Sequence, residues 1–348
     1  MNKQRQLAYA SARHYKVEGH AIERDRFFMF VLVEMFILLL LLTACSRSAT
    51  CFNAGVTVDK SGRLVTASAD GLASPNSDML KEVHAWPGPS GSKLVFSAQQ
   101  YAVSDDGNYL YLRPSLLVEN RVGVLGLTLV SLDTGLYSPI VSPSVSWGAP
   151  VAPTLLAVGQ HNKLFEASSD GTVMEVAGLP ALPAHVTRRK LSGLREQPFL
   201  SFAAGDEGTL YFTFPTRRSI GVFRADGTYS SIGGPSTLLD RPEGVAVGRG
   251  GRIFVAEPRL KAILVFAFGA EGDSKPIAVL KGQRTSLIAP RAVALDEQGR
   301  LYVFDGPSET SSETVLHYIR VYPNVQHWGD LAPQRTYPIN STCWAPAT

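Results

Sequence analysis

A segment in the C-terminal third of the chain repeats after 48 residues without a gap. Residues 242–255 begin Pro-Glu-Gly-Val-Ala-Val and end Gly-Arg-Ile-Phe-Val, while residues 290–303 begin Pro-Arg-Ala-Val-Ala-Leu and end Gly-Arg-Leu-Tyr-Val. Each copy has an apolar stretch, a turn that ends with Gly, and a second apolar stretch rich in β-branched and aromatic residues, which is typical of a β-hairpin. A fixed period of this size indicates a repeat architecture.

Four more hairpins in the same frame precede these two copies. Their first strands begin in the segments 55–59, 102–105, 156–159 and 202–205. Intervals of roughly 43 to 55 residues leave room for about four strands in each unit, the content of one propeller blade. The sequence therefore predicts an all-β fold, a six-bladed β-propeller over residues 55–348, with blades near 55–98, 99–150, 151–195, 196–238, 239–285 and 286–348.

The repeated residues resemble a known family. Pro-x-Gly-Val-Ala-Val, Gly-Arg-Ile-Phe-Val-Ala-Glu and Ile-Leu-Val-Phe in residues 242–266 look like the NHL repeat, and residues 289–322 are similar. The connectors 268–273 and 329–336 resemble those of bacterial NHL-type propellers. The resemblance implies a propeller of the NHL or gluconolactonase-like kind. Gluconolactonase-like propellers hold a divalent ion in the channel, but no residue set in this sequence matches their ligands one by one.

The N-terminal residues predict export. Residues 1–26 carry six Lys or Arg, residues 27–42 are apolar apart from Glu34, and Leu-Thr-Ala-Cys ends the run at Cys45. A positive segment, an apolar segment and small residues before a cleavage point describe a signal peptide. The last four residues resemble the lipobox of bacterial lipoproteins, which implies a signal peptide at 1–44, a diacylated Cys45 and a lipidated tether at 45–54. An uncleaved transmembrane helix over 27–44 is the alternative. Both place the propeller in the bacterial cell envelope, on the extracytoplasmic side of a membrane.

The two remaining cysteines flank the predicted ring. Cys51 precedes the first hairpin and Cys343 follows the last strands, so a closed ring brings both near its seam. An oxidising compartment permits a disulfide, and one closing so long a loop stabilises by about 4–5 kcal/mol in the chain-entropy model. We predict a Cys51–Cys343 bond, with two unpaired thiols as the alternative.

The charge balance narrows the partners. The whole chain has 33 Lys and Arg against 30 Asp and Glu, and removing residues 1–44 takes away six and four of these, which leaves a net charge near +1. A near-neutral domain lacks the basic surface that nucleic-acid binding requires. We therefore expect no nucleic-acid partner, and expect contact with a membrane through Cys45 and with a protein or glycan.

The repeat also predicts where a binding surface lies. In a blade, the first strand leaves one face of the ring and the second returns to it, so strand starts and hairpin exits gather on one face. Glu257 and Asp305 end the second strand of their hairpins, where a carboxylate commonly accepts N–H groups of the following turn. The predicted rim consists of Arg217, Arg218, Arg241, Glu243, Glu257, Arg259, Arg291 and Asp305.

Signals for catalysis are weak. The histidines after residue 45 form no close pair with the spacing of metal ligands, and no Gly-x-Ser-x-Gly or phosphate-binding Gly-rich motif occurs. The sequence assigns no catalytic residue, metal ligand or cofactor. It favours a non-catalytic binding or scaffold module that presents the rim to its partner. The alternative is a metal-dependent lactonase- or lyase-like enzyme.

Overall fold

The computed structural model describes residues 56–341 except 69–70, 74–92, 96–100, 105, 114, 119–120, 125, 133, 135–136, 141–145, 148–153, 183, 195–197, 307–314 and 325–328. All of them belong to one compact unit, Cys51–Cys343; the second unit, Met1–Thr50 with Trp344–Thr348, lies outside them. They form β-strands and short 3-10 turns. The all-β class is therefore confirmed, and no helix in this part of the chain is long and apolar enough to cross a membrane.

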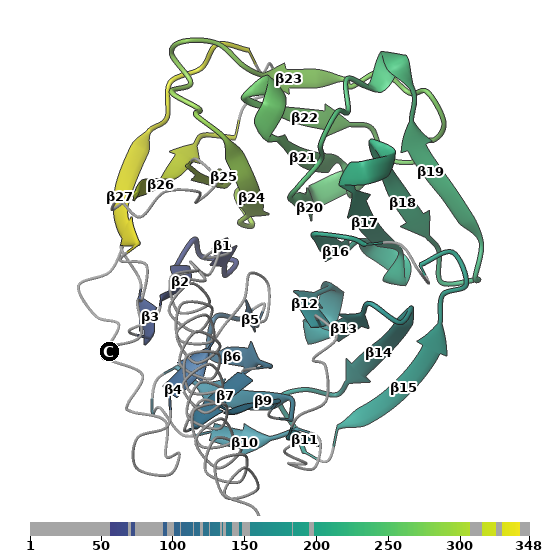
Figure 1. Cartoon of the computed structure of the whole chain (residues 1–348), viewed down its shortest axis with the longest axis vertical. Coiled ribbons are helices and arrows are strands. Elements are labelled where there is room, and N and C mark those ends of the chain that lie inside the picture. Colours follow the sequence, from purple (N-terminus) through teal and green to yellow (C-terminus); the bar gives the residue numbers. More distant parts are fainter. Residues whose placement is uncertain are drawn as a thin grey trace, which may run out of the picture. The chain divides into compact units, whose positions relative to one another are not determined.

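Six sheets surround a central axis, and their innermost strands are β1, β5, β12, β16, β20 and β24 (Figure 1). Each innermost strand contacts the next one around the axis, and β24 contacts β1, which closes the ring. We number the sheets by their place in the ring. Sheet 1 has three strands, β1 (Val56–Val58), β2 (Leu64–Ser68) and β3 (Gly71–Ala73).

The other five sheets are complete four-stranded blades. Blade 2 contains β5 (Tyr101–Val103), β6 (Tyr109–Leu112), β9 (Thr128–Ser131) and β10 (Tyr137–Pro139); blade 3 contains β12 (Thr154–Val158), β13 (Leu164–Ser168), β14 (Thr172–Ala177) and β15 (His185–Lys190); blade 4 contains β16 (Phe202–Ala204), β17 (Leu210–Phe214), β18 (Ser219–Phe223) and β19 (Tyr229–Gly233); blade 5 contains β20 (Val245–Val247), β21 (Ile253–Glu257), β22 (Ala262–Phe266) and β23 (Ala278–Leu280); blade 6 contains β24 (Pro290–Leu295), β25 (Leu301–Asp305), β26 (Val315–Tyr322) and β27 (Arg335–Ser341).

The prediction of six blades is wrong in its count, because the described chain builds five complete blades. Sheet 1 holds the remaining place in the ring, and the described residues give it three strands. The next strand along the chain, β4 (Lys93–Val95), pairs with β7 (Ser115–Val118) instead of β3. With β8 (Arg121–Val124) and β11 (Ser146–Trp147), these two strands form a separate sheet. The hairpin β7–β8 is inserted between the second and third strands of blade 2, an insertion that the repeat could not reveal.

The repeated hairpins pair in equivalent registers. Val245 lies opposite Val255 in blade 5, and Val293 lies opposite Val303 in blade 6. Each turn closes with a residue of positive φ, such as Gly251 at 71°. Every residue of β21 is buried, because neighbouring blades cover both of its faces. This double cover explains why the second strands are continuous apolar runs rather than alternating ones.

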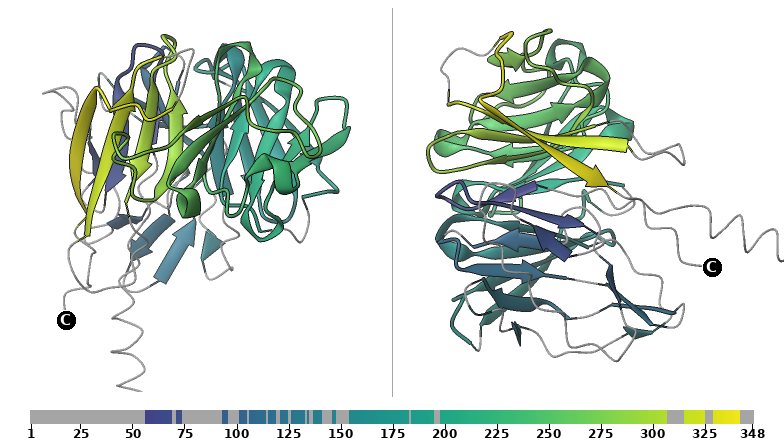
Figure 2. Two further views of the ribbon diagram at one scale, coloured as in Figure 1. Left: turned by 90° about the horizontal axis from the view of Figure 1, so that it is seen from above. Right: turned by 90° about the vertical axis from the view of Figure 1, so that its left-hand side faces the viewer.

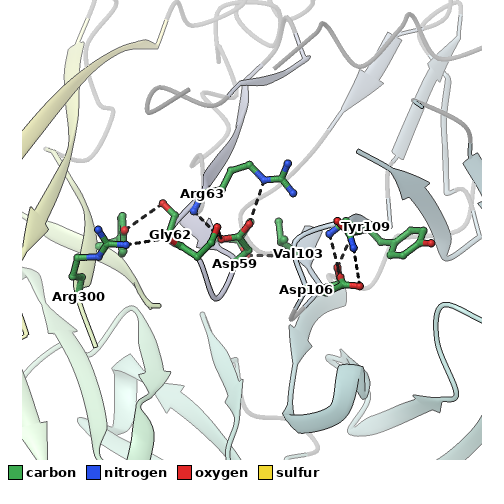
Figure 3. Close-up of polar contacts among 12 residues, drawn as sticks. Asp59, Gly62, Arg63, Val103, Asp106, Tyr109 and Arg300 are labelled. Carbon is green, nitrogen blue, oxygen red and sulfur yellow. Dashed lines mark hydrogen bonds and ion pairs between the residues drawn. The ribbon is translucent and has the colours of Figure 1, made fainter. Parts of the chain in front are cut away.

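The two ends of the ring meet through polar contacts between blade 6 and sheet 1 (Figure 3). The guanidinium of Arg300 donates to the Ser61 carbonyl at 3.1 Å, and the hydroxyl of Tyr302 donates to the Gly62 carbonyl at 3.3 Å. The Glu297 N–H donates to the Lys60 carbonyl at 3.2 Å. Within the described residues no sheet combines strands from both ends of the chain. The predicted Cys51–Cys343 bond lies outside the described residues.

Candidate functional site

A cavity of about 590 Å³ occupies the channel between the six innermost strands. Its wall consists mainly of Val, Ala and Leu side chains, among them Val56, Ala157, Ala204, Val247 and Leu295. These positions lie on the first strand of each sheet, where the chain passes closest to the axis (Figure 1). The side chains along the wall are therefore mostly small and uncharged.

The mouth of this cavity is charged. The turn that follows each innermost strand places a polar side chain at the opening, including Lys60, His161, Asp206, Arg249 and Glu297. Arg249 and Glu297 come from neighbouring blades and form an ion pair with 2.5 Å between nitrogen and oxygen. Both side chains are largely exposed, so the pair is screened by solvent and contributes little to stability. The mouth thus presents charges of both signs around an apolar channel.

The wall and the mouth differ in chemistry. The cavity-lining residues from the six innermost strands include no Asp, Glu, His, Lys or Arg. The described residues contain no group of three or more His, Cys, Asp or Glu side chains arranged to hold a metal ion. The channel therefore has uncharged side chains along its wall and charged side chains at its turns.

The predicted rim lies at the other end of the strands. None of its eight residues lines the channel cavity. Each first strand runs from this rim towards the hairpin turns, so the rim and the mouth occupy opposite faces. Figure 2 shows the strands running between these two faces. We call them the strand-start face and the hairpin-turn face.

Two of the rim carboxylates are fully buried and serve the backbone. Glu257 accepts the N–H groups of Asp240 at 3.0 Å and Arg241 at 2.9 Å. Asp305 accepts those of Ile288 and Ala289 at 2.9 and 2.8 Å. The donors lie 16 or 17 residues before the carboxylate, where the chain approaches the first strand of the same blade. Burial raises the pKa of Glu257, and the N–H groups of Asp240 and Arg241 partly offset that rise.

Four rim arginines form ion pairs, and two of these pairs, Arg218–Asp240 and Arg291–Glu243, join neighbouring blades. Arg218 and Arg259 both contact Asp240, at 3.0 and 3.1 Å. Arg291 contacts Glu243 at 3.1 Å, and Arg241 contacts it at 3.4 Å. The eighth rim residue, Arg217, is exposed and forms no ion pair with a described residue. The structure places the rim residues on one face, uses the buried acids as structural groups and leaves four of the five arginines exposed.

Sequence reasoning missed two aspartates in the connectors. Asp273 accepts the Ser236 N–H at 2.6 Å, and Asp330 accepts the Arg284 N–H at 2.7 Å. Each aspartate belongs to one blade and binds the linker that leads into that blade from the preceding one. The signal was present, since each Asp follows a Gly in the two similar connectors, but only the fold identifies the partner.

A buried carboxylate between blades 2 and 3 was also missed. Glu166 on β13 pairs with Arg113 at 3.0 Å and is almost fully buried. Burial raises the pKa of Glu166 above its ordinary value of 4.5, and the positive charge of Arg113 opposes that rise. The pair holds two neighbouring blades together outside the channel.

This pKa shift predicts a pH-dependent stability difference. In the unfolded chain Glu166 loses its proton near pH 4.5, but in the folded protein it does so only at higher pH. Its contribution to stability is therefore complete below pH 4.5 and is lost as the pH rises through the folded pKa. We expect Glu166→Gln, which carries no titrating group, to gain stability relative to wild type over that rise. Urea unfolding at several pH values measures the difference, and a relative loss of stability with rising pH would contradict it.

No protein-family profile and no curated protein sequence matches the chain. Among solved structures, it resembles a protein of unknown function from Bacteroides caccae with a TM-score of 0.50 and 11% identity, over 74% of this chain and 89% of that chain. A virginiamycin B lyase from Staphylococcus aureus matches with a TM-score of 0.48 and 14% identity, over 84% and 93% of the two chains. An aldose sugar dehydrogenase from Streptomyces coelicolor matches at 0.45 and 15%, over 78% and 95%. At such low identity these likenesses show the fold alone, and the chain is a β-propeller.

Proposed function

We propose that this chain is an exported binding module, held at a bacterial membrane by a lipid on Cys45, whose propeller binds a protein partner without catalysis. The observation that carries the proposal is the channel, which has mostly small apolar side chains along its wall and charged side chains at its mouth. The N-terminal sequence that ends at Cys45 supports export and anchoring. The family resemblance of the repeat to NHL propellers accords with a binding role.

The chemistry of the channel favours a protein segment over a glycan. Burial of an apolar side chain gains about 25 cal/mol for each Å² removed from water. Charges of both signs at Lys60, Asp206, Arg249 and Glu297 suit the mixed charges of a polypeptide. Sugar rings are commonly held by exposed aromatic faces, whereas the two aromatic residues that line the cavity, Tyr101 and Phe202, are buried.

A variant that fills the channel tests the binding site. Ala204 lies on the channel wall and is half-buried, so Ala204→Phe places a ring inside the cavity. A photoreactive residue at Arg249 first identifies the partner in the native membrane. We expect Ala204→Phe to weaken binding of that purified partner by roughly tenfold or more, a loss of about 1.4 kcal/mol. The control Ala225→Phe, at an exposed turn, should bind as wild type does. Equal binding by both variants, with unchanged melting temperature, would exclude the channel as the site.

The anchor has its own test. We expect Cys45→Ala to remove the lipid, so that the processed protein moves from the membrane fraction to the soluble fraction. A Cys45→Ala protein that stays membrane-bound after signal processing would contradict the lipid anchor and leave the channel proposal intact.

A further inference from the structure

The strand-start face of blades 4–6 exposes large apolar side chains. Leu200, Leu238 and Ile288 lie in the segments that lead to β16, β20 and β24, and they are 47%, 47% and 40% exposed. They come from three consecutive blades and approach the ring from the same side. A large apolar residue is thus exposed at the same end of three neighbouring blades.

The same face carries an excess of exposed positive charge. Of its acidic residues, Glu257 and Asp305 are fully buried, Glu243 is nearly so and Asp240 is partly exposed. Asp273 and Asp330 are exposed beside the linkers to blades 5 and 6, so three acids face six exposed cations. The exposed basic side chains lie in the turns between the second and third strands of blades 4 and 5, and in the linkers that lead to blades 5 and 6. They are Arg217, Arg218, Arg241, Arg259, Lys261 and Arg284.

The chain reaches the ring on this face. Val56 begins β1 and pairs with Thr66, whereas the turn after β1 lies at the other end of the hairpin. Cys45 precedes Val56 by 11 residues, which span at most about 36–40 Å when fully extended. To reach a membrane on the hairpin-turn face, the tether must run from the start of β1 outward across a blade and then along the length of a strand, a path of roughly 30 Å. Only a tether stretched along the side of the propeller could bring that face to the bilayer, whereas the strand-start face needs no detour.

We propose that the strand-start face of blades 4–6 docks on the headgroup region of an anionic bilayer. The exposed arginines contact lipid phosphates, and Leu200, Leu238 and Ile288 reach the boundary with the acyl chains. Lys and Arg side chains suit this position because their apolar stems pack on apolar surface while their charges stay in the polar layer. Docking of this face turns the channel mouth away from the membrane, towards a partner. The proposal rests on the Cys45 anchor.

Photocrosslinking to lipid tests which face is docked. A photoreactive residue replaces either Leu200 or Phe268, and Phe268 is a matched exposed residue that follows β22 at the opposite end of its blade. The full-chain lipidated protein is placed in vesicles of phosphatidylcholine with phosphatidylglycerol. We expect lipid adducts at position 200 to exceed those at position 268 by at least about fivefold. Equal yields, more adducts at 268, or adducts to protein instead of lipid at 200 would overturn the proposal.

Charge reversal tests the role of the cations. Arg217→Glu/Arg284→Glu changes two exposed residues of the strand-start face, and Lys163→Glu/Arg252→Glu makes the same charge change beside the hairpin turns. The first double variant should lose adducts at position 200 by at least about fivefold for each reversed cation, and the second should not. Vesicles of phosphatidylcholine alone should lower the wild-type yield at position 200 at least as much. If the yield of adducts at position 200 changes neither when anionic lipid is left out nor in the Arg217→Glu/Arg284→Glu variant, electrostatic docking is contradicted.

Failure of the anchor is distinguishable from failure of the docking. Release of the lipidated protein from vesicles, or retention of Cys45→Ala in the cell membrane after its signal peptide is removed, would contradict the lipid anchor. Stable retention through Cys45 with equal adducts at both positions would keep the anchor and reject the docked face.

Discussion

Replacement of Asp305 by Ala is expected to lower the free energy of unfolding by about 3–5 kcal/mol. Asp305 is fully buried and forms an ion pair with Arg320 at 2.8 Å, and Arg320 is itself almost fully buried. Removal of the carboxylate leaves a buried guanidinium without its counter-charge. It also leaves the N–H groups of Ile288 and Ala289 without their acceptor. All the groups affected belong to blade 6 or to the linker that leads into it.

Chemical denaturation of the full chain measures this effect. Asp226→Ala is the matched control, because Asp226 is an exposed turn residue that accepts hydrogen bonds from Thr228. We expect that control to cost about 1 kcal/mol or less. A similar small cost for Asp305→Ala would show that the buried pair is not an important support of blade 6.

The second large effect is expected for Gly244→Ala, at about 1–3 kcal/mol of destabilisation. A Cβ at Gly244 would lie 2.5 Å from the Arg291 carbonyl oxygen and 2.8 Å from the Cα of Ala292. These atoms belong to the backbone of the next blade, so they cannot move aside as the end of a side chain can. The added methyl group must therefore push blades 5 and 6 apart.

The melting temperature and urea midpoint of Gly244→Ala measure the loss of stability. Gly329→Ala is the control, since a Cβ there meets no atom within 4 Å. The control should stay within about 0.5 kcal/mol of wild type. A wild-type stability for Gly244→Ala would show that the contact between the two blades yields more easily than their backbone geometry implies.

The repeat predicted the hairpins and the propeller class because its residues are those that a doubly covered strand requires. Ile253 to Ala256 are apolar since two blades enclose them, so the pattern is local and visible in the sequence. The pairing of β4 with β7 is different, because it depends on which strand edge is free when the sheet forms. Residues 93–95 carry no sequence pattern that indicates whether β4 pairs with β3 or with β7. The count of complete blades therefore could not be predicted.

The candidate site was predicted less well than the fold. The rim residues do gather on one face, as strand direction implies. The exposure of each rim side chain could not be predicted from the sequence. Glu257 and Arg259, for example, are two residues apart, yet Glu257 is buried and Arg259 is exposed. The channel wall left no signal, since Ala157 and Ala204 resemble any other small strand residue. Only closure of the ring makes them the lining of a cavity.

The closure of the ring has a consequence for how the protein folds during its synthesis. Sheet 1 is made first, but its partner β24 begins at Pro290, more than 200 residues later. The sides of Val56, Val58 and Leu64 that blade 6 covers stay open to water until then. Because contacts so distant in sequence form slowly, we expect this side of the first sheet to be covered late in folding. The last blade made thus completes the first.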